Sequence, residues 1–217
     1  MPKSLLKTVI ADQRMEMKRP KKVIDRELLQ RIPTKLENKA LIIKGLRRVG
    51  KSTMLKLFVQ SKFKDRFYYL NFDDERLFDF KVEDFQLMME CFIETMENCR
   101  TLFLDEIQNV VGWESFVNRM LRSDYTVYIT GSNANLLSKE LGTHLMGRHL
   151  DFELFPFSFR EFLLASKVEI PETDSFDTGT IAKMTVSFEE YFRSGGMPEI
   201  VLSKNTEILS SLISDNI

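Results

Sequence analysis

Residues 45–52 contain the residue types that a phosphate-binding loop requires. They read Gly-Leu-Arg-Arg-Val-Gly-Lys-Ser, which fits the pattern G-x-x-x-x-G-K-[ST] at every specified position. Gly45 and Gly50 allow backbone dihedrals that other residues rarely adopt, and they let the backbone approach an anion without a Cβ in the way. Successive N–H groups of the loop can then converge on phosphate oxygens. Lys51 would add a positive charge at the β- and γ-phosphates, and the hydroxyl of Ser52 would bind magnesium.

The segments on either side of the loop strengthen this interpretation. An apolar run at residues 40–44 predicts a strand that enters the loop, and the pattern over 51–63 predicts a helix that leaves it. The amino-terminal end of that helix would favour the same anion. The sequence therefore predicts a nucleoside triphosphate site with bound magnesium. The predicted nucleotide contacts are Gly45, Val49, Gly50, Lys51, Ser52 and Thr53.

A pair of carboxylates follows a second apolar run. Residues 101–104 are Thr-Leu-Phe-Leu, and Asp105 and Glu106 come directly after them. Asp105 would hold magnesium through water and steady Ser52, whereas Glu106 would orient and polarise an attacking water. Alternatively, the two acids are solvated residues that end a strand. The complete phosphate-binding loop favours the functional interpretation.

The acidic pair also bears on the type of reaction. Small-molecule kinases usually lack a glutamate directly after the aspartate, because their substrate supplies the nucleophile. The pair therefore favours hydrolysis, as does an additional predicted strand at residues 67–72, which lies between the loop and the acidic pair. Two alternatives remain open. One is a nucleotide-binding switch that hydrolyses little, and the other is a kinase with an acceptor pocket formed by residues 73–100.

A further predicted strand, residues 126–130, ends in Gly131-Ser132-Asn133. If this strand lies between the loop strand and the acidic strand, its end faces the γ-phosphate. Ser132 or Asn133 could then hold the attacking water. It is equally consistent with the local sequence that Asn133 caps the next helix.

Apolar strands alternate with helical patterns as far as Pro156, which predicts an α/β sandwich around a parallel sheet. Polar residues follow the carboxyl ends of the predicted strands, where open α/β sheets bind ligands. After Pro156 only helical patterns occur. We therefore expect a basic lead-in at 1–22, a nucleotide-binding core at 23–156 and a small helical appendage at 157–217.

Composition excludes several classes of function. The net charge is −1, so no global field draws the chain to nucleic acid, although a nucleic-acid partner remains possible. The segment before Leu36 is locally basic, and it is interpreted as a solvated surface in preference to a nucleic-acid arm. No apolar run is long enough for a membrane span. Cys91 and Cys99 are too far apart along one predicted helix to form a disulfide, which favours the cytoplasm.

Taken together, the motifs resemble a known family. Gly-Leu-Arg-Arg-Val-Gly-Lys-Ser, Phe-Leu-Asp-Glu-Ile-Gln-Asn-Val, Thr-Gly-Ser-Asn and Gly-Arg148 occur in order, followed by the segments 154–163 and 195–199. The sequence resembles the prokaryotic AAA+-like P-loop ATPases that carry a C-terminal domain with a nuclease-like fold. The resemblance implies ATP as the nucleotide, hydrolysis to ADP and a five-stranded sheet of order 5-1-4-3-2. It also favours Asn133 over Ser132 as the water-sensing residue.

The resemblance implies a role for Arg148 as an arginine finger or phosphate sensor, with a loop salt bridge as the alternative. An arginine finger acting across subunits would imply a homo-oligomer, and a conformational switch would act on a protein partner that the sequence does not identify. Residues 195–198 would lie in a helical lid and contact the adenine, or simply end a helix. Members of the family usually extend further, so we expect the nuclease-like domain to lie outside this chain.

Overall fold

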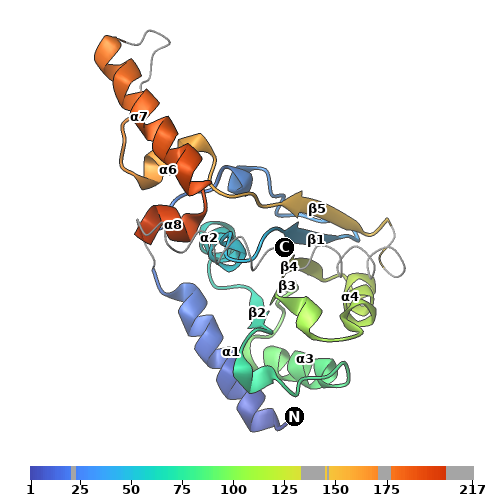
Figure 1. The fold of residues 1–217 in the computed structure, drawn as a ribbon. Helices are drawn as coiled ribbons and strands as arrows, with labels where there is room; N and C mark the ends of the chain where they lie inside the picture. The colour runs from blue at the N-terminus through green and yellow to red at the C-terminus, as the bar shows by residue number, and fades with distance from the viewer. Residues whose placement is uncertain (21–22, 133–144, 146, 171–176, 204–217) are drawn as a thin grey trace. The chain divides into compact units, whose positions relative to one another are not determined.

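The computed structural model describes residues 1–20, 23–132, 145, 147–170 and 177–203 (Figure 1). The chain forms two compact units, which are described separately below. The first unit comprises Met1–Lys21, Ile32–Gly45 and Lys51–Glu153. The second comprises Lys22–Arg31, Leu46–Gly50 and Leu154–Ile217.

A five-stranded parallel sheet forms the centre of the first unit (Figure 1). Its strands are β1 (Ala40–Lys44), β2 (Tyr68–Asn71), β3 (Thr101–Asp105), β4 (Thr126–Gly131) and β5 (His149–Glu153). Their spatial order is β2-β3-β4-β1-β5, with every neighbouring pair parallel. This confirms the predicted order 5-1-4-3-2 and the predicted P-loop NTPase fold. Because β4 lies between β1 and β3, the carboxyl ends of these three strands adjoin one another.

Alternating side chains of the sheet pack into two helical layers. On one face, strand residues such as Ile42, Leu104 and Ile129 join a buried cluster with residues of α1 (Lys3–Lys18), α3 (Asp84–Thr95) and α4 (Trp113–Arg122). On the other face, the rings of Phe103 and Tyr128 stack, and both adjoin aromatic side chains at and just after α2 (Lys51–Lys62). The result is the predicted three-layer sandwich.

Helix α1 (Lys3–Lys18) contains most of the segment that the sequence suggested was a polar lead-in. Its buried side chains include Leu6, Val9 and Ile10, and they lie in the core of the first unit. Figure 1 shows the helix beside β2 and α3. Gln13 completes the outer edge of the sheet: its Oε1 accepts from the Asn71 N–H at 2.8 Å, and its Nε2 donates to the Asn71 carbonyl at 3.1 Å. An edge strand otherwise presents such groups to solvent.

The described part of the second unit is helical and contains no strand. Its elements are the 3₁₀ turn η1 (Glu27–Gln30), α6 (Phe159–Ala165), α7 (Thr178–Ser194) and α8 (Pro198–Ser203). Aromatic rings pack α6 against α7: Phe159 and Phe162 of α6 contact Phe188 and Tyr191 of α7. Apolar residues in 23–31 have the spacing of a helix, but only the single 3₁₀ turn η1 forms there. The sequence also predicts a short helix at 136–141, a segment that lies outside the described residues.

Glycines end α7 as the sequence suggested. Gly195 takes a left-handed conformation with φ of 62°, and its N–H donates to the Tyr191 carbonyl at 3.0 Å. A Cβ at Gly196 would lie 2.6 Å from the Phe157 carbonyl oxygen, so only glycine fits there. Pro198 then begins α8, where its missing N–H costs nothing.

Candidate active site

Asp105 is the buried centre of the polar cluster at the carboxyl end of the first unit's sheet. The residue is fully buried at the last position of β3. Its Oδ1 accepts a hydrogen bond from the Thr130 hydroxyl, and its Oδ2 accepts from the Tyr69 hydroxyl at 3.0 Å. Burial raises the pKa of Asp105, whereas hydrogen bonds from Thr130, Ser52 and Tyr69 act to lower it. These donors compensate in part for burying a carboxylate.

Glu106 is held in place through both its backbone and its side chain. It adopts a left-handed conformation with φ of 52°, which is uncommon for a residue with a side chain. Its N–H donates to the Thr130 hydroxyl oxygen at 3.1 Å. Its Oε2 accepts from the Ser132 N–H at 3.1 Å and from Gln108 Nε2 at 2.6 Å. Its carboxylate is therefore directed by β4 and by the turn after β3.

Lys51 connects the phosphate-binding loop to this cluster. Its Nζ lies 3.5 Å from Glu106 Oε1 and donates to the Gly45 carbonyl at 3.2 Å. The side chain is almost completely buried, with 3% of its surface exposed. Within the first unit, Lys51 thus connects Gly45, the first residue of the loop, to the acidic pair.

The oxygen atoms of this cluster fit a magnesium ion. Mg²⁺ prefers hard oxygen ligands and usually keeps several waters, so it needs only one or two protein groups. The exposed hydroxyl of Ser52, at the start of α2, and the carboxylate of Asp105 share a hydrogen bond and could supply those groups. Because Thr130 and Tyr69 occupy both oxygens of Asp105, this carboxylate is better suited to hold the ion through water.

Three residues of the cluster were not predicted from the sequence: Tyr69, Thr130 and Gln108. Tyr69 and Thr130 sit inside strands and looked like ordinary β-sheet residues. Gln108 donates to Glu106 and also reaches Ser132 Oγ at 3.4 Å, while its own Oε1 is buried without a hydrogen-bond partner among the described residues. A signal was present, since each lies at or near the carboxyl end of a strand, where polar residues gather in such sheets.

Ser132 and Asn133 are the two candidates to hold the attacking water. Ser132 lies beside the acidic pair, whereas Asn133 lies outside the described residues. The contact made by Ser132 is through its backbone N–H to Glu106. Thr130, two residues earlier, contributes the side-chain contacts at this end of β4.

Arg148 lies at the opposite, amino-terminal end of the strands of the same sheet. It precedes β5, and its carbonyl accepts from the N–H of Ala40, the first residue of β1. The phosphate-binding loop follows the other end of β1, so roughly 20 Å of extended strand separates Arg148 from Gly45. An arginine side chain does not span that distance. The structure therefore does not bring Arg148 to the phosphate-binding loop through the first unit of its own chain.

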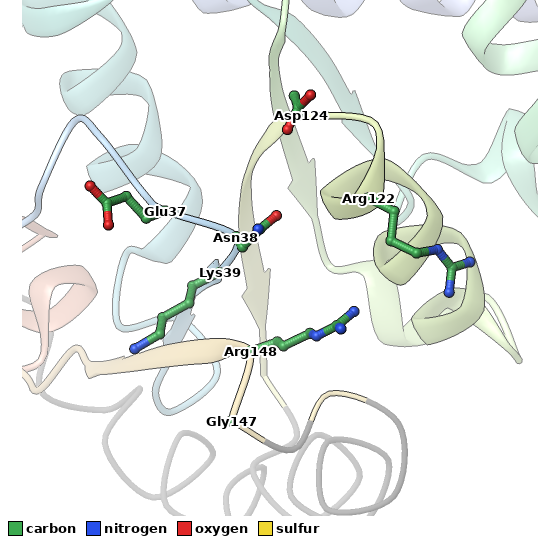
Figure 2. Close-up of a pocket in the computed structure, with 7 residues that line it drawn as sticks. All are labelled: Glu37, Asn38, Lys39, Arg122, Asp124, Gly147 and Arg148. Carbon is green, nitrogen blue, oxygen red and sulfur yellow. The ribbon is translucent and has the colours of Figure 1, made fainter.

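Arg148 instead lines a pocket of about 540 Å³ at the amino-terminal ends of the strands (Figure 2). Figure 2 shows its side chain extending on the side of α4, whereas Lys39 extends the opposite way. The remaining lining residues are Glu37, Asn38, Arg122, Asp124 and Gly147. The pocket is thus lined by charges of both signs.

The middle of the phosphate-binding loop, Leu46–Gly50, belongs to the second unit. Val49 is fully buried, and Gly50 has φ of 94°, a conformation that glycine tolerates and other residues rarely adopt. Arg48 Nη1 lies 3.4 Å from Glu199 Oε2 in α8. Of the two predicted nucleotide contacts in this part of the loop, Val49 is buried and Gly50 provides the turn with positive φ.

Comparison with known families assigns the chain. Residues 37–163, more than half of the sequence, match a family described as an AAA domain. The chain belongs to this AAA domain family. Membership supports nucleotide binding and, at the level of the family, ATPase chemistry. The matched range includes both the phosphate-binding loop and the acidic pair.

Relatives of this AAA domain protein extend well beyond it. An uncharacterised protein of Methanocaldococcus jannaschii is 35% identical over 214 residues, which cover 98% of this chain and 47% of the relative. An uncharacterised protein of Haemophilus influenzae is 34% identical over 211 residues, which cover 91% of this chain and 50% of the relative. The chain therefore spans about half the length of these relatives.

Solved structures show the same fold at low sequence identity. The chain superposes on C. elegans PCH-2 with a TM-score of 0.52 at 15% identity, covering 99% of this chain and 63% of PCH-2. It superposes on AMPPCP-bound DnaA from Aquifex aeolicus with a TM-score of 0.51 at 15% identity, covering 84% of this chain and 57% of DnaA. Both likenesses concern the fold alone. Within the part of the chain that the structure describes, no helix has both the length and the apolar character to cross a membrane.

Proposed function

We propose that this AAA domain binds ATP with magnesium and hydrolyses it to ADP and phosphate, driving a conformational switch. The observation that supports this most directly is the position of Glu106. Its carboxylate lies 3.5 Å from the ammonium group of Lys51 and next to the buried Asp105. A lysine that binds the β- and γ-phosphates would thus hold the γ-phosphate beside Glu106, the residue that activates water.

Each group of the cluster has a distinct task in this proposal. Backbone N–H groups from Val49 to Thr53 bind phosphate oxygens at the amino-terminal end of α2. Ser52 and Asp105 hold magnesium, which offsets negative charge on the phosphates when it is bound. Glu106 orients a water for attack on the γ-phosphorus and accepts one of its protons. The bond from the γ-phosphorus to the bridging oxygen breaks, and ADP leaves with that oxygen.

The proposal is tested by phosphate release from the purified chain with magnesium and ATP. Lys51→Ala should weaken ATP binding by about tenfold or more, because a charge-assisted contact to phosphate is lost. Glu106→Gln should lower turnover by roughly 100-fold while ATP binding persists, because a general base contributes about that much. Arg122→Gln, on the outer side of α4, is a matched control and should change neither quantity. Turnover and affinity that are unchanged in Lys51→Ala would rule the proposal out.

A nucleotide-binding switch with little hydrolysis is the second candidate, and the contacts of Glu106 favour it. The carboxylate of Glu106 already contacts Lys51, Gln108 and the Ser132 N–H. One of these contacts must break before the carboxylate can accept a proton from water. In this case ATP binds tightly and phosphate release is very slow. Glu106→Gln would then leave the slow rate almost unchanged, which distinguishes this function from the first.

A further inference from the structure

Arg26 is a buried arginine whose guanidinium group contacts the phosphate-binding loop within the second unit. Only 6% of the residue is exposed. Its Nη1 donates to the Val49 carbonyl at 3.1 Å, and its Nη2 donates to the Phe155 carbonyl at 2.6 Å. Its Nε donates to Glu161 Oε1 at 3.1 Å. All three sides of the planar guanidinium group are therefore engaged.

Glu161 is held as firmly as the arginine. Its side chain is 5% exposed, and Oε1 also accepts from the Glu27 N–H at 2.8 Å. Its Oε2 accepts from the Ser158 N–H at 3.0 Å, which completes the capping box at the start of α6. The Phe157 ring lies 4.9 Å from the guanidinium carbon of Arg26. The pair thus joins η1, the start of α6 and the loop in one buried network.

The contact with Val49 determines how one peptide unit of the loop is oriented. A trans peptide is planar, so the carbonyl of Val49 and the N–H of Gly50 point in opposite directions. Because Arg26 holds the carbonyl, the Gly50 N–H is directed away from Arg26. Gly50 has φ of 94° and can also take other backbone conformations, so its own dihedrals do not fix this peptide.

We propose that Arg26 and Glu161 are positioning residues for triphosphate binding. Arg26 holds the Val49–Gly50 peptide with its N–H available to phosphate, and Glu161 holds Arg26. The inference rests on the proposed function, because it assigns these residues to the loop that binds ATP. It also makes the affinity for ATP depend on the start of α6: a movement that separates Glu161 from Arg26 releases the peptide and weakens binding.

Three variants of the full chain test this pair. Arg26→Lys keeps the positive charge but loses the planar fork, so it cannot maintain all three contacts. Glu161→Gln keeps the shape of the side chain but removes its charge. Arg160→Lys is the matched control, since Arg160 is the exposed neighbour of Glu161 in α6. Mg-ATP binding is measured by calorimetry, together with the binding stoichiometry and the thermal unfolding midpoint.

Arg26→Lys should raise the Kd for Mg-ATP by about tenfold, since one hydrogen bond to a charged phosphate group is misdirected. Stoichiometry should stay at the wild-type value, and turnover at saturating ATP should stay within a fewfold. A purely structural defect would instead lower the stoichiometry and the turnover together. Glu161→Gln should raise the Kd in the same direction, and Arg160→Lys should leave it unchanged.

The double variant tests whether the two residues act as a unit. If Glu161 acts through Arg26, the double variant binds Mg-ATP no more weakly than Arg26→Lys alone. If the losses of binding free energy in the two single variants add up in the double variant, the two residues act independently, and their proposed action as a unit is wrong. If Arg26→Lys fails to fold, the Kd of Glu161→Gln for Mg-ATP provides the test. A wild-type Kd in Glu161→Gln would then contradict the inference.

Lys51→Ala separates this inference from the proposed function. Wild-type affinity in Arg26→Lys, alongside lost binding in Lys51→Ala, overturns the role of Arg26 and leaves the proposed function intact. A wild-type chain that binds no Mg-ATP overturns both.

Discussion

At the scale of single residues, Gln108 is the side chain whose contacts bear most directly on turnover. Its Nε2 holds Glu106 Oε2 at 2.6 Å, while its buried Oε1 has no partner among the described residues. Gln108→Leu removes the donor and the orphaned acceptor with little change in volume. We expect turnover to fall about tenfold, because the base loses one hydrogen bond that orients its charged group. Steady-state phosphate release at saturating ATP checks this.

Asn109→Leu is the matched control for Gln108, because the neighbouring Asn109 amide donates to the Phe72 carbonyl and not to Glu106. It should leave turnover within about twofold of wild type. A rise in turnover in Gln108→Leu would contradict the expectation. It would show that Gln108 holds Glu106 away from the attacking water instead of orienting it.

Residue types and spacing predicted part of this site and could not predict the rest. Lys51, Asp105 and Glu106 belong to short contiguous patterns, so the sequence alone indicated them as candidates, and the structure brings their side chains together. Thr130 contacts Asp105, 25 positions away in the sequence, and Arg26 contacts Glu161, 135 positions away. No local pattern reports such a pairing, because it exists only after the chain has folded.

At the scale of elements, the turn after β2, which α1 contacts through Gln13, makes stability depend on pH. Arg76 hydrogen-bonds Asp74 through Nε and Nη2, and Gln13 of α1 donates to the same carboxylate at 2.9 Å. Chiefly through Arg76, these contacts hold the pKa of Asp74 well below its usual range. The folded-state pKa is thus below the unfolded-state value of about 4. Asp74 therefore stabilises the fold fully above that value and loses its contribution as the pH falls further.

Asp74→Asn should accordingly lower the urea midpoint at pH 7 and make the midpoint fall less steeply between about pH 5 and pH 3. Asp73→Asn, at the exposed neighbouring position, should leave both the midpoint and its pH dependence close to wild type. If the urea midpoint falls equally steeply with pH in Asp74→Asn and in the wild type, this role for Asp74 is contradicted. Urea unfolding followed by circular dichroism across this pH range provides the measurement.

Most elements were predictable, and α1 shows why some were not. The apolar strands and the helices between them carry periodic patterns that match the observed elements within a few residues. In α1 the buried positions Leu6, Val9 and Ile10 are interspersed with lysines, so net charge suggested a solvated segment. Whether such a helix packs depends on an apolar surface supplied elsewhere, here by β2 and α3, and not on its own residues.

At the scale of the whole molecule, the sheet order came from the resemblance and not from local sequence. Parallel strands need long crossovers, so neighbours along the chain need not be neighbours in space. β1 lies between β4 and β5, both of which follow it by more than 80 residues. This order places the loop strand beside β4 and makes the site possible. Because β5 runs parallel to β1, Arg148 lies at the amino-terminal end of the strands, opposite the loop, which bears on how the molecule would assemble.

Arg148 could act on ATP only if a second copy presented it, because its own loop lies at the far end of β1. We therefore expect turnover per chain to rise steeply with protein concentration. Arg148→Ala should remove that rise and lower turnover by roughly 1000-fold at high concentration, as the loss of an arginine finger does elsewhere. ATP affinity should change little, because the loop is intact. Phosphate release measured across protein concentration, with sedimentation of the same samples, checks both quantities.

A mixing experiment identifies the direction of the contact. Glu106→Gln chains lack the base but keep Arg148, and Arg148→Ala chains lack the finger but keep the base. If the arginine acts across copies, mixing these two inactive variants restores part of the turnover, because some interfaces pair an intact base with an intact arginine. Arg122→Ala, in the same pocket, is the matched control and should retain full turnover. Turnover that is independent of concentration, and no recovery on mixing, would assign Arg148 to the pocket alone, where Glu37 and Asp124 supply opposite charges.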